Sequence, residues 1–321
     1  MASPRTRRTP ATPGYSVVIP VYNSERIVGE TVARTVAFFE KQKLSFEIIL
    51  VNDASADGSW KLISGLAKKD GRIKAINLLR NYGQHNANLC GFRHATGDWL
   101  VTMDDDLQNP PEEIVHLIGK AAEGHHDLVL GRFRTKQHAS YRRWGSKVVN
   151  WLNGKIFDKP EGLVLSNFRL LHADVVKRIC DYQSPFPYIP GLALMFSASP
   201  ANVDVDHQPR REGKSSYTLF RIAKLVATIL FNYSSFPLRL VMGVGLAVSL
   251  GSFVFGIAVL VHGFMHHSAV PGWTTLAVLL SFLNGMLMLM VGILGEYMVR
   301  LLTQASGRAP YQVKEVVDLD R

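Results

Sequence analysis

Residues 15–23, YSVVIPVYN, form a short apolar run that is interrupted by Pro20 and ends at Asn23. A helix-like segment follows from Ser24 to about Lys41, and residues 46–59, FEIILVNDASADGS, form a second apolar run that breaks into an Asp/Ser/Gly turn. Strands that alternate with helices in this order predict a parallel sheet with crossover helices. The sequence therefore predicts an α/β fold with a mixed, mostly parallel, Rossmann-like sheet.

A third apolar strand ends in an acidic cluster at residues 101–108, VTMDDDLQ. Side chains two positions apart on an extended segment point to the same side, so Asp104 and Asp106 can share a ligand while Asp105 faces away, towards a ligand hydroxyl. Carboxylate and amide oxygens suit Mg²⁺ or Mn²⁺, which leaves room for phosphate oxygens of a substrate. The alternative is a solvated acidic turn before a helix, for which residues 110–113, PPEE, are well suited.

These polar residues follow three different predicted strands. In open α/β sheets, ligands bind beyond the carboxyl ends of the strands. Asn23, Asp53 and the triplet Asp104–Asp106 all fall at such ends. We therefore expect them to border one crevice.

The C-terminal third of the chain is strongly apolar. The 321 residues are 47% hydrophobic, with a mean hydropathy of +0.07 and a formal charge of +10. Residues 241–261 and 273–295 contain no Asp, Glu, Lys or Arg, and each run is long enough to cross a hydrocarbon core of ~30 Å. Two transmembrane helices are predicted; the alternative is a pair of buried core helices.

Basic residues predict how these helices are oriented. Lys and Arg precede the first apolar run and follow the second, whereas the connecting residues 262–272 contain neither, which places both termini in the cytoplasm. Apolar residues recur at helical spacing between 217 and 236, with Arg221 and Lys224 interleaved. This pattern favours a helix in the membrane interface, although an amphipathic helix packed on the soluble domain has the same pattern. The predicted organisation is a disordered tail (1–14), a catalytic domain (15–216), an interfacial segment (217–236), a two-helix membrane anchor (237–302) and a cytoplasmic tail (303–321).

Several short motifs together resemble a known family. They are IPVYN (19–23), NDASADGS (52–59), RNYGQH (80–85), the triplet with DLQNPPEE (106–113), and GEY (295–297). From about residue 15 to residue 317 the chain resembles the polyprenyl-phosphate glycosyltransferases of glycosyltransferase family 2, which have a GT-A fold. This group includes dolichol-phosphate mannose synthase and the undecaprenyl-phosphate 4-deoxy-4-formamido-arabinose transferases.

The resemblance implies a membrane-bound, inverting glycosyltransferase of the bacterial inner membrane. Such an enzyme moves a sugar from a nucleotide-sugar donor, here favoured as UDP-linked, to undecaprenyl phosphate for modification of cell-envelope lipid or polysaccharide. Mg²⁺ or Mn²⁺ would be held by Asp104, Asp106 and Gln108 and would neutralise the departing diphosphate. The catalytic domain would face the cytoplasm, membrane lipid would be a partner, and a homo-oligomer is allowed because family members can be tetrameric.

Roles for individual residues also come from the resemblance. Donor-nucleotide binding is expected of Pro20, Tyr22, Glu25, Asp53, Asp104 and Asp105. Binding of the acceptor phosphate is expected of Arg132, Arg142, Ser146, Arg169, Arg210, Lys214 and Ser215. The residues expected to be catalytic are Asp105, Arg132 and Arg210. For any single arginine a solvated surface role remains the alternative, since the chain has 36 Lys and Arg.

One position departs from the family pattern. Asn167 stands before Phe168 and Arg169 where many relatives carry an acid, so either that carboxylate is dispensable or the donor sugar differs. Arg169 could instead form a structural ion pair with Asp174 or another acid. The sequence identifies neither the sugar, the nucleotide nor the prenol.

Two other function classes remain open on the sequence alone. A processive polysaccharide synthase would need a Gln/Arg-x-x-Arg-Trp motif, and residues 140–144, SYRRW, lack its first residue. A non-enzymatic basic membrane adaptor is favoured only by the charge, and it would have no use for carboxylates at a strand end. No nucleic-acid-binding motif is present, so no nucleic-acid partner is expected.

Overall fold

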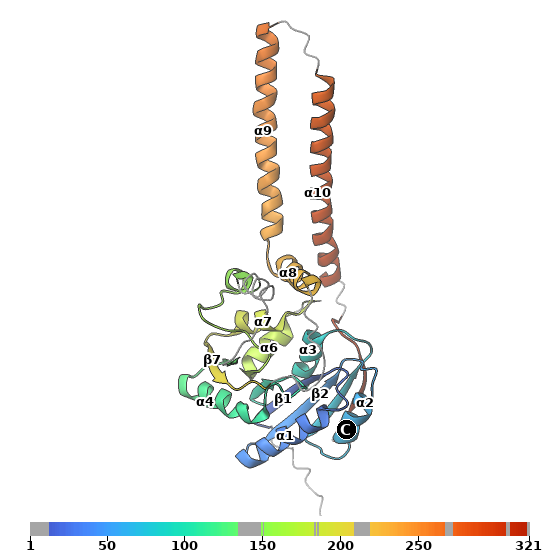
Figure 1. Ribbon diagram of the computed structural model, residues 1–321, viewed down its shortest axis with the longest axis vertical. Coiled ribbons are helices and arrows are strands. Elements are labelled where there is room, and N and C mark those ends of the chain that lie inside the picture. The colour runs from blue at the N-terminus through green and yellow to red at the C-terminus, as the bar shows by residue number, and fades with distance from the viewer. Residues whose placement is uncertain are drawn as a thin grey trace, which may run out of the picture. The chain divides into compact units, whose positions relative to one another are not determined.

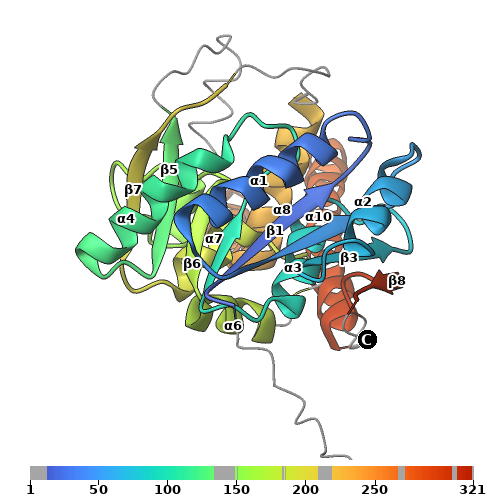
Figure 2. The same cartoon turned by 90° about the horizontal axis from the view of Figure 1, so that it is seen from below.

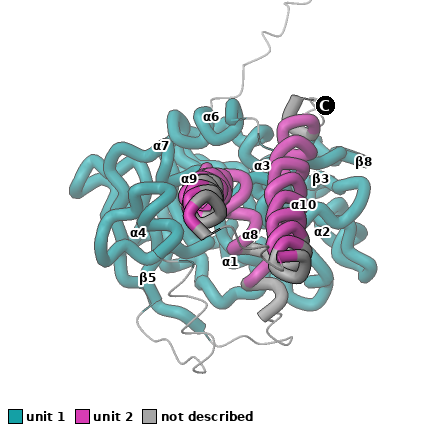
Figure 3. The backbone as a smooth tube through the Cα atoms, turned by 90° about the horizontal axis from the view of Figure 1, so that it is seen from above, with its two compact units in different colours: residues 1–218, 309–321 teal, residues 219–308 magenta. Residues whose placement is uncertain are grey.

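The structure is a computed structural model that describes residues 13–133, 149, 151–182, 184, 186–208, 219–266, 272–305 and 309–319. The chain divides into two compact units, residues 1–218 with 309–321 and residues 219–308, coloured separately in Figure 3. The predicted tail up to residue 12 and the predicted site residues Arg142, Ser146, Arg210, Lys214 and Ser215 lie outside the described residues.

The first unit is built on an eight-stranded sheet with the order β7-β5-β6-β4-β1-β2-β3-β8 (Figures 1 and 2). Its strands are β1 (Tyr15–Val21), β2 (Phe46–Asn52), β3 (Ile73–Leu78), β4 (Trp99–Thr102), β5 (Leu128–Phe133), β6 (Arg169–His172), β7 (Pro200–Val205) and β8 (Val313–Val317). Strands β4, β1, β2 and β3 run parallel, β6 is antiparallel to β4 and β5, and β8 is antiparallel to β3. The mixed, mostly parallel α/β architecture predicted from the sequence is confirmed.

Helices cover both faces of this sheet. They are α1 (Val28–Gln42), α2 (Ser59–Ala67), α3 (Gln84–His94), the 3₁₀ helix η1 (Pro111–Glu113), α4 (Ile114–Gly124), α6 (Ala173–Asp181) and α7 (Ile189–Phe196). One face buries apolar side chains of α1, α2 and α4, among them Phe39, Ile63 and Leu117. Helix α3 packs on the other face so closely that a Cβ at Gly91 would lie 2.3 Å from Val18 Cγ1.

Strand β2 lies inside the sheet, between β1 and β3, and is buried along its whole length. All seven of its residues are buried, as expected for a parallel strand that has helices on both faces. Its sequence, FEIILVN, is accordingly apolar on both sides, with Glu47 as the charged exception. The Glu47 carboxylate accepts hydrogen bonds from Ser16 Oγ at 2.6 Å and from Lys74 Nζ at 2.9 Å, so the buried charge is compensated.

Strand β8 lies within the segment predicted as a cytoplasmic tail. It pairs with β3 from Ala75↔Val317 to Leu78↔Val313 and forms one edge of the eight-stranded sheet. The sequence analysis did not predict this strand. Its residues 313–316 are exposed, so the alternation of buried and exposed positions that identifies a half-buried strand is absent.

The second unit consists of α8 (Leu219–Tyr233), α9 (Phe236–His266) and α10 (Trp273–Ala305). Within the described residues, the stretch Phe282–Leu302 is long and apolar enough to cross a membrane. A second candidate is the pair Val226–Tyr233 and Phe236–Val248, which is bent by 77° at the break between α8 and α9. Both apolar runs predicted as membrane spans are therefore helical, while their crossing of a membrane stays a prediction.

Candidate active site

Three loops meet at the carboxyl ends of the parallel strands. Strands β1, β2 and β4 are neighbours in the sheet, with Val21 opposite Asn52 and Val18 opposite Thr102. The segments that follow them therefore emerge at the same edge. They carry Asn23, Asp53 and the triplet Asp104–Asp106, so these polar residues lie at one edge of the sheet, while the crevice expected between them stays a prediction.

Asp105 joins the acidic triplet to the loop between β1 and α1. Its carboxylate accepts hydrogen bonds from the Tyr22 N–H at 3.3 Å and from the Ser24 hydroxyl. Its backbone carbonyl accepts a hydrogen bond from Thr31 Oγ1 at 2.9 Å. Asp105 was expected to face a ligand hydroxyl; the hydroxyl that its carboxylate contacts here is that of Ser24, within the protein.

The β1–α1 and β2–α2 loops are bonded to each other along their length. The Asn23 N–H donates to Ser55 Oγ at 3.0 Å, and Asn23 Oδ1 accepts from the Ala56 N–H at 2.9 Å. Glu25 Oε2 accepts from the Gly58 N–H at 2.9 Å. A Cβ at Gly58 would lie 2.2 Å from Glu25 Oε1, so a larger residue there would push the Glu25 carboxylate out of its present position. The predicted donor residue Glu25 is thus held against the β2–α2 loop.

Asp53 holds a third loop in place. Its carboxylate accepts hydrogen bonds from the backbone N–H groups of Tyr82 at 2.7 Å and Gly83 at 2.8 Å. Burial raises the pKa of Asp53, and these two hydrogen bonds oppose the shift. Gly83 has a φ of 86°, a conformation that favours glycine, where the loop turns into α3. Asp53, predicted to contact the donor base, therefore also shapes the loop beside it.

The triplet carboxylates repel one another. Burial, followed by the charge of Asp106, raises the pKa of Asp104 to about 6. Burial raises the pKa of Asp105 to about 7 against the hydrogen bond from Ser24. A divalent cation would relieve this repulsion, because it adds positive charge where carboxylates crowd. The chemistry of the residues therefore fits the predicted Mg²⁺ or Mn²⁺.

The protein by itself supplies only part of a metal site. Among the described residues, no group of three His, Cys, Asp or Glu side chains is arranged to hold a metal ion. Gln108 is bonded through its backbone, since its N–H donates to Asp106 Oδ1 at 3.1 Å and its carbonyl accepts from the Gln208 N–H at 3.0 Å. A cation at Asp104, Asp106 and Gln108 would thus take further ligands from a substrate diphosphate, as hard cations commonly do.

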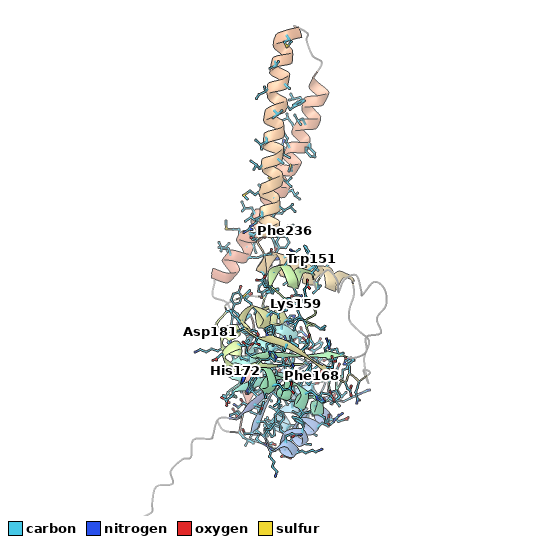
Figure 4. The ribbon with its side chains drawn as sticks, turned by 90° about the vertical axis from the view of Figure 1, so that its left-hand side faces the viewer. Trp151, Lys159, Phe168, His172, Asp181 and Phe236 are labelled. Atoms are coloured by element: carbon cyan, nitrogen blue, oxygen red, sulfur yellow. The ribbon has the colours of Figure 1, made fainter. Side chains whose placement is uncertain are left out.

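Arg169 lies close enough to the triplet for its charge to act on Asp104. It follows Phe168, which is labelled in Figure 4, and both side chains are completely buried. Its Nε donates to Thr102 Oγ1 at 2.9 Å and its Nη2 donates to Asn167 Oδ1 at 3.3 Å, while Nη1 is buried without a hydrogen-bond partner. The ion pair with Asp174 that the sequence allowed does not form: the Asp174 carboxylate lies 3.4 Å from His172 Nδ1 instead.

Asn167, which stands where many relatives carry an acid, is engaged in several hydrogen bonds. Its side chain hydrogen-bonds both Asp104 and Arg169, and its carbonyl accepts from Thr102 Oγ1 at 2.6 Å. The amide thus bridges a predicted metal ligand and a buried guanidinium. A role for Arg169 in binding the acceptor phosphate stays a prediction, and its burial favours a positioning role.

Arg132, another predicted phosphate ligand, is at the end of β5 and half exposed. Its Nε forms an ion pair with Asp204 Oδ1 of β7 at 2.5 Å. A phosphate would have to compete with this carboxylate. The catalytic and acceptor roles of Arg132 stay predictions.

Gln84 and His85 of α3, and Tyr188 just before α7, were given no site role in the sequence analysis and lie close to the predicted site residues. Gln84 Nε2 donates to Asp104 Oδ1 at 2.6 Å. The His85 ring lies edge-on to Tyr188, with centroids 5.5 Å apart, and its Nδ1 is buried without a hydrogen-bond partner. Gln84 and His85 belong to the RNYGQH motif, which was the available signal. Tyr188 is separated from any motif and could be found only in three dimensions.

Comparison with known proteins identifies the family. Residues 16–177 match the family described as Glycosyl transferase family 2. The undecaprenyl-phosphate 4-deoxy-4-formamido-L-arabinose transferase of Shewanella sediminis is 33% identical over 309 residues, which cover 94% of this chain and 92% of that protein. The enzyme of the same name from Pseudomonas aeruginosa is 35% identical over 311 residues, with coverages of 94% and 90%.

A solved structure shows a similar fold. Glucosyl-3-phosphoglycerate synthase from Mycobacterium tuberculosis, in complex with Mn²⁺, UDP-glucose and phosphoglyceric acid, matches with a TM-score of 0.51 and 16% identity. The match covers 68% of this chain and 78% of that one. The family match runs from β1 through β6 and includes each loop of the site. The chain belongs to glycosyl transferase family 2.

Proposed function

We propose that this protein transfers a sugar from a nucleotide-sugar donor to undecaprenyl phosphate, with inversion at the anomeric carbon, for modification of the bacterial cell envelope. The proposal rests on one observation. The β1–α1 loop is hydrogen-bonded both to the β2–α2 loop and to the acidic triplet. A nucleoside diphosphate needs such a crevice at the strand ends. Relatives over nearly the whole chain are named as undecaprenyl-phosphate sugar transferases, which supports the acceptor.

The donor would lie across these loops. Pro20, Tyr22, Glu25 and Asp53 would border the nucleotide, and Asp104 and Asp105 would face its diphosphate. Mg²⁺ or Mn²⁺ at Asp104, Asp106 and Gln108 would neutralise the charge that develops on the leaving diphosphate. A UDP-linked donor is favoured because a structure of the same fold is described with Mn²⁺ and UDP-glucose.

The acceptor needs positioning more than activation. A lipid phosphate is already an anion at neutral pH, so no strong general base is required. Arg132 and Arg210, with Arg142, Ser146, Lys214 and Ser215, are the proposed phosphate ligands. A planar guanidinium can bind two phosphate oxygens at once.

We place the enzyme in the bacterial inner membrane, with its catalytic unit and both termini in the cytoplasm. Residues 313–317 pair with β3 in the catalytic sheet. They must therefore lie on the same side of any membrane as β3. The intervening chain then crosses an even number of times, which agrees with two spans built from the α8–α9 region and α10.

The decisive experiment is a transfer assay. Purified protein in detergent is incubated with Mn²⁺, undecaprenyl phosphate and a panel of labelled nucleotide sugars. Label from at least one donor should appear in a lipid product that is absent when undecaprenyl phosphate is omitted. No lipid product with any donor would reject the proposed acceptor, and label in a long polymer would indicate a processive synthase instead.

A further inference from the structure

We propose that β8, the strand that follows the apolar helices, is a positioning element for the donor-nucleotide site. The inference rests on the proposed function, because it assigns the crevice to a nucleotide. It concerns residues 309–317, all of which belong to the same compact unit as the sheet. The family motifs of the site lie elsewhere, so the sequence offers no reason to connect this segment with nucleotide binding.

The contact begins where β3 ends. Beyond the paired residues of β3 and β8, the Leu79 N–H donates to the Gln312 carbonyl at 2.9 Å. Leu79 is the first residue after β3, and only three residues separate it from Gly83. The strand thus fixes the start of the loop whose other end, at Tyr82 and Gly83, is bonded to the Asp53 carboxylate.

A second anchor lies on the helix that follows this loop. Tyr311 is 7% exposed, and its hydroxyl accepts a hydrogen bond from Arg93 Nη1 at 3.5 Å. The Arg93 guanidinium lies 5.5 Å from the centroid of the Tyr311 ring, within the range of a cation–π contact. Arg93 belongs to α3, which begins at Gln84 directly after the loop. The adjacent residues Gln312 and Tyr311 therefore contact the first residue of the segment 79–83 and the helix that follows it.

The end of β3 also reaches the other loops of the crevice. Asn77, which pairs with Glu315 of β8, accepts a hydrogen bond from Asn52 Nδ2 at 2.8 Å. Asn52 Oδ1 accepts from Ser55 Oγ at 2.6 Å, and Ser55 Oγ accepts from the Asn23 N–H at 3.0 Å. A displacement of β3 would therefore also displace the β2–α2 and β1–α1 loops, because these hydrogen bonds connect them.

The strand is also easily released. It has five residues, lies at the edge of the sheet and has exposed positions from 313 to 316. Short, exposed edge elements open at a lower free energy than the core of a domain. Removing β8 should therefore loosen residues 79–83 without unfolding β1 and β2, whose residues are nearly all buried.

The test compares the full chain with a variant that ends at Arg308. Amide hydrogen exchange should become faster at residues 79–83 and stay unchanged in β1 and β2. Binding of UDP in the presence of Mn²⁺, measured by calorimetry, should weaken by about tenfold or more, which corresponds to about 1.4 kcal/mol. In the transfer assay the KM for the nucleotide sugar should rise more than the KM for undecaprenyl phosphate.

Two further variants and a rescue separate positioning from general destabilisation. Tyr311→Ala should reproduce part of the effect, whereas Lys314→Ala, at an exposed position of the same strand, should bind UDP as the full chain does. A synthetic peptide of residues 309–321 should restore UDP binding to the truncated protein. The proposal is overturned if truncation lowers the melting temperature but leaves the loop's exchange and the UDP affinity unchanged. Should the full chain itself bind no UDP, the choice of donor fails, and the exchange data alone decide the role of β8.

Discussion

Asp106 is the residue whose loss should affect the reaction most directly. If it helps to bind the cation on the donor diphosphate, Asp106→Ala should lower the transfer rate by roughly 10³-fold, about 4 kcal/mol of transition-state stabilisation. Excess chelator should abolish transfer in the unchanged protein, and Mn²⁺ should restore it.

Asp98 offers a matched control, because it is an exposed acid just before the opposite end of β4. Asp98→Asn should retain the full rate. Undiminished transfer by Asp106→Ala, or by the original protein in excess chelator, would remove the metal from the mechanism.

The second prediction concerns His85 and how the stability of the fold depends on pH. Burial, followed by the positive charge of Arg169, lowers the pKa of His85 from 6.5 to about 4. The folded protein thus holds a neutral imidazole where the unfolded chain binds a proton. Protonation therefore favours the unfolded chain: stability is highest above pH 6.5 and falls as the pH drops from about 6.5 to about 4, by an amount on the order of 2 to 3 kcal/mol.

Thermal unfolding in detergent at pH 7.5 and pH 5 measures this effect. The melting temperature of His85→Gln should fall less between the two pH values than that of the original protein. His116, whose side chain is 51% exposed, supplies the control variant His116→Gln, for which the original pH dependence is expected. Parallel curves for His85→Gln and the original protein would contradict the assignment.

At the scale of elements, the break between α8 and α9 is held by the end of α10. Arg300 Nη1 donates to Asn232 Oδ1 at 2.6 Å, and its guanidinium carbon lies 5.2 Å from the centroid of the Phe231 ring. Tyr297 Oη donates to the Ser234 carbonyl at 3.2 Å. The GEY motif of the sequence thus ends in the tyrosine that bonds to this bend.

Arg300→Ala should loosen the bend, since a hydrogen bond of this kind to a charged group contributes roughly 1.5 to 3 kcal/mol. Amide exchange at residues 232–236 should become faster, while exchange in the catalytic sheet should not change. Arg239→Ala removes the same charge from an exposed position of α9 and serves as the control. Equal exchange in both variants would mean that Arg300 does not hold the bend.

The elements that the sequence predicted share one property, a regular pattern of burial. Strands β1 and β2 are continuous apolar runs that end in polar residues, and both apolar helices of the second unit are evident from their length. Helix α1 begins at Val28 instead of Ser24. The Ser24 N–H donates to Ser59 Oγ, and its hydroxyl donates to the Asp105 carboxylate. Ser24 therefore connects the loops at the strand ends and does not begin the helix.

Elements that depend on distant partners could not be predicted in this way. The pairing of β8 requires β3 as a template, and its own side chains carry no burial pattern. The burial of Arg169 could not be predicted from the sequence, because its Nε is bonded to Thr102 at the end of β4, a distant segment of the chain. The strand-end acids were found because they end apolar runs, whereas Tyr188, which lies just before α7 and outside any motif, meets His85 only in the folded chain.

At the scale of the whole molecule, the pairing of β8 with β3 predicts a measurable topology. A reporter fused after Arg321 should be on the cytoplasmic side, and one inserted near Ser268 should be on the opposite side, because residues 262–272 lack Lys and Arg. Both reporters on one side would show that α9 or α10 does not cross. A periplasmic reporter after Arg321 would contradict the pairing of β8 itself.

The order of the elements, with β8 after both apolar helices, also bears on how the protein is made. The ribosome completes β1 to β7 and both apolar helices before it synthesises residues 313–317. Until then β3 is an open edge, which is a site for wrong pairing with other chains. The sheet can be closed only after the apolar helices have left the ribosome. A chain stalled or cleaved within these helices would therefore retain an open edge at β3, a feature by which quality-control proteases and chaperones could recognise it.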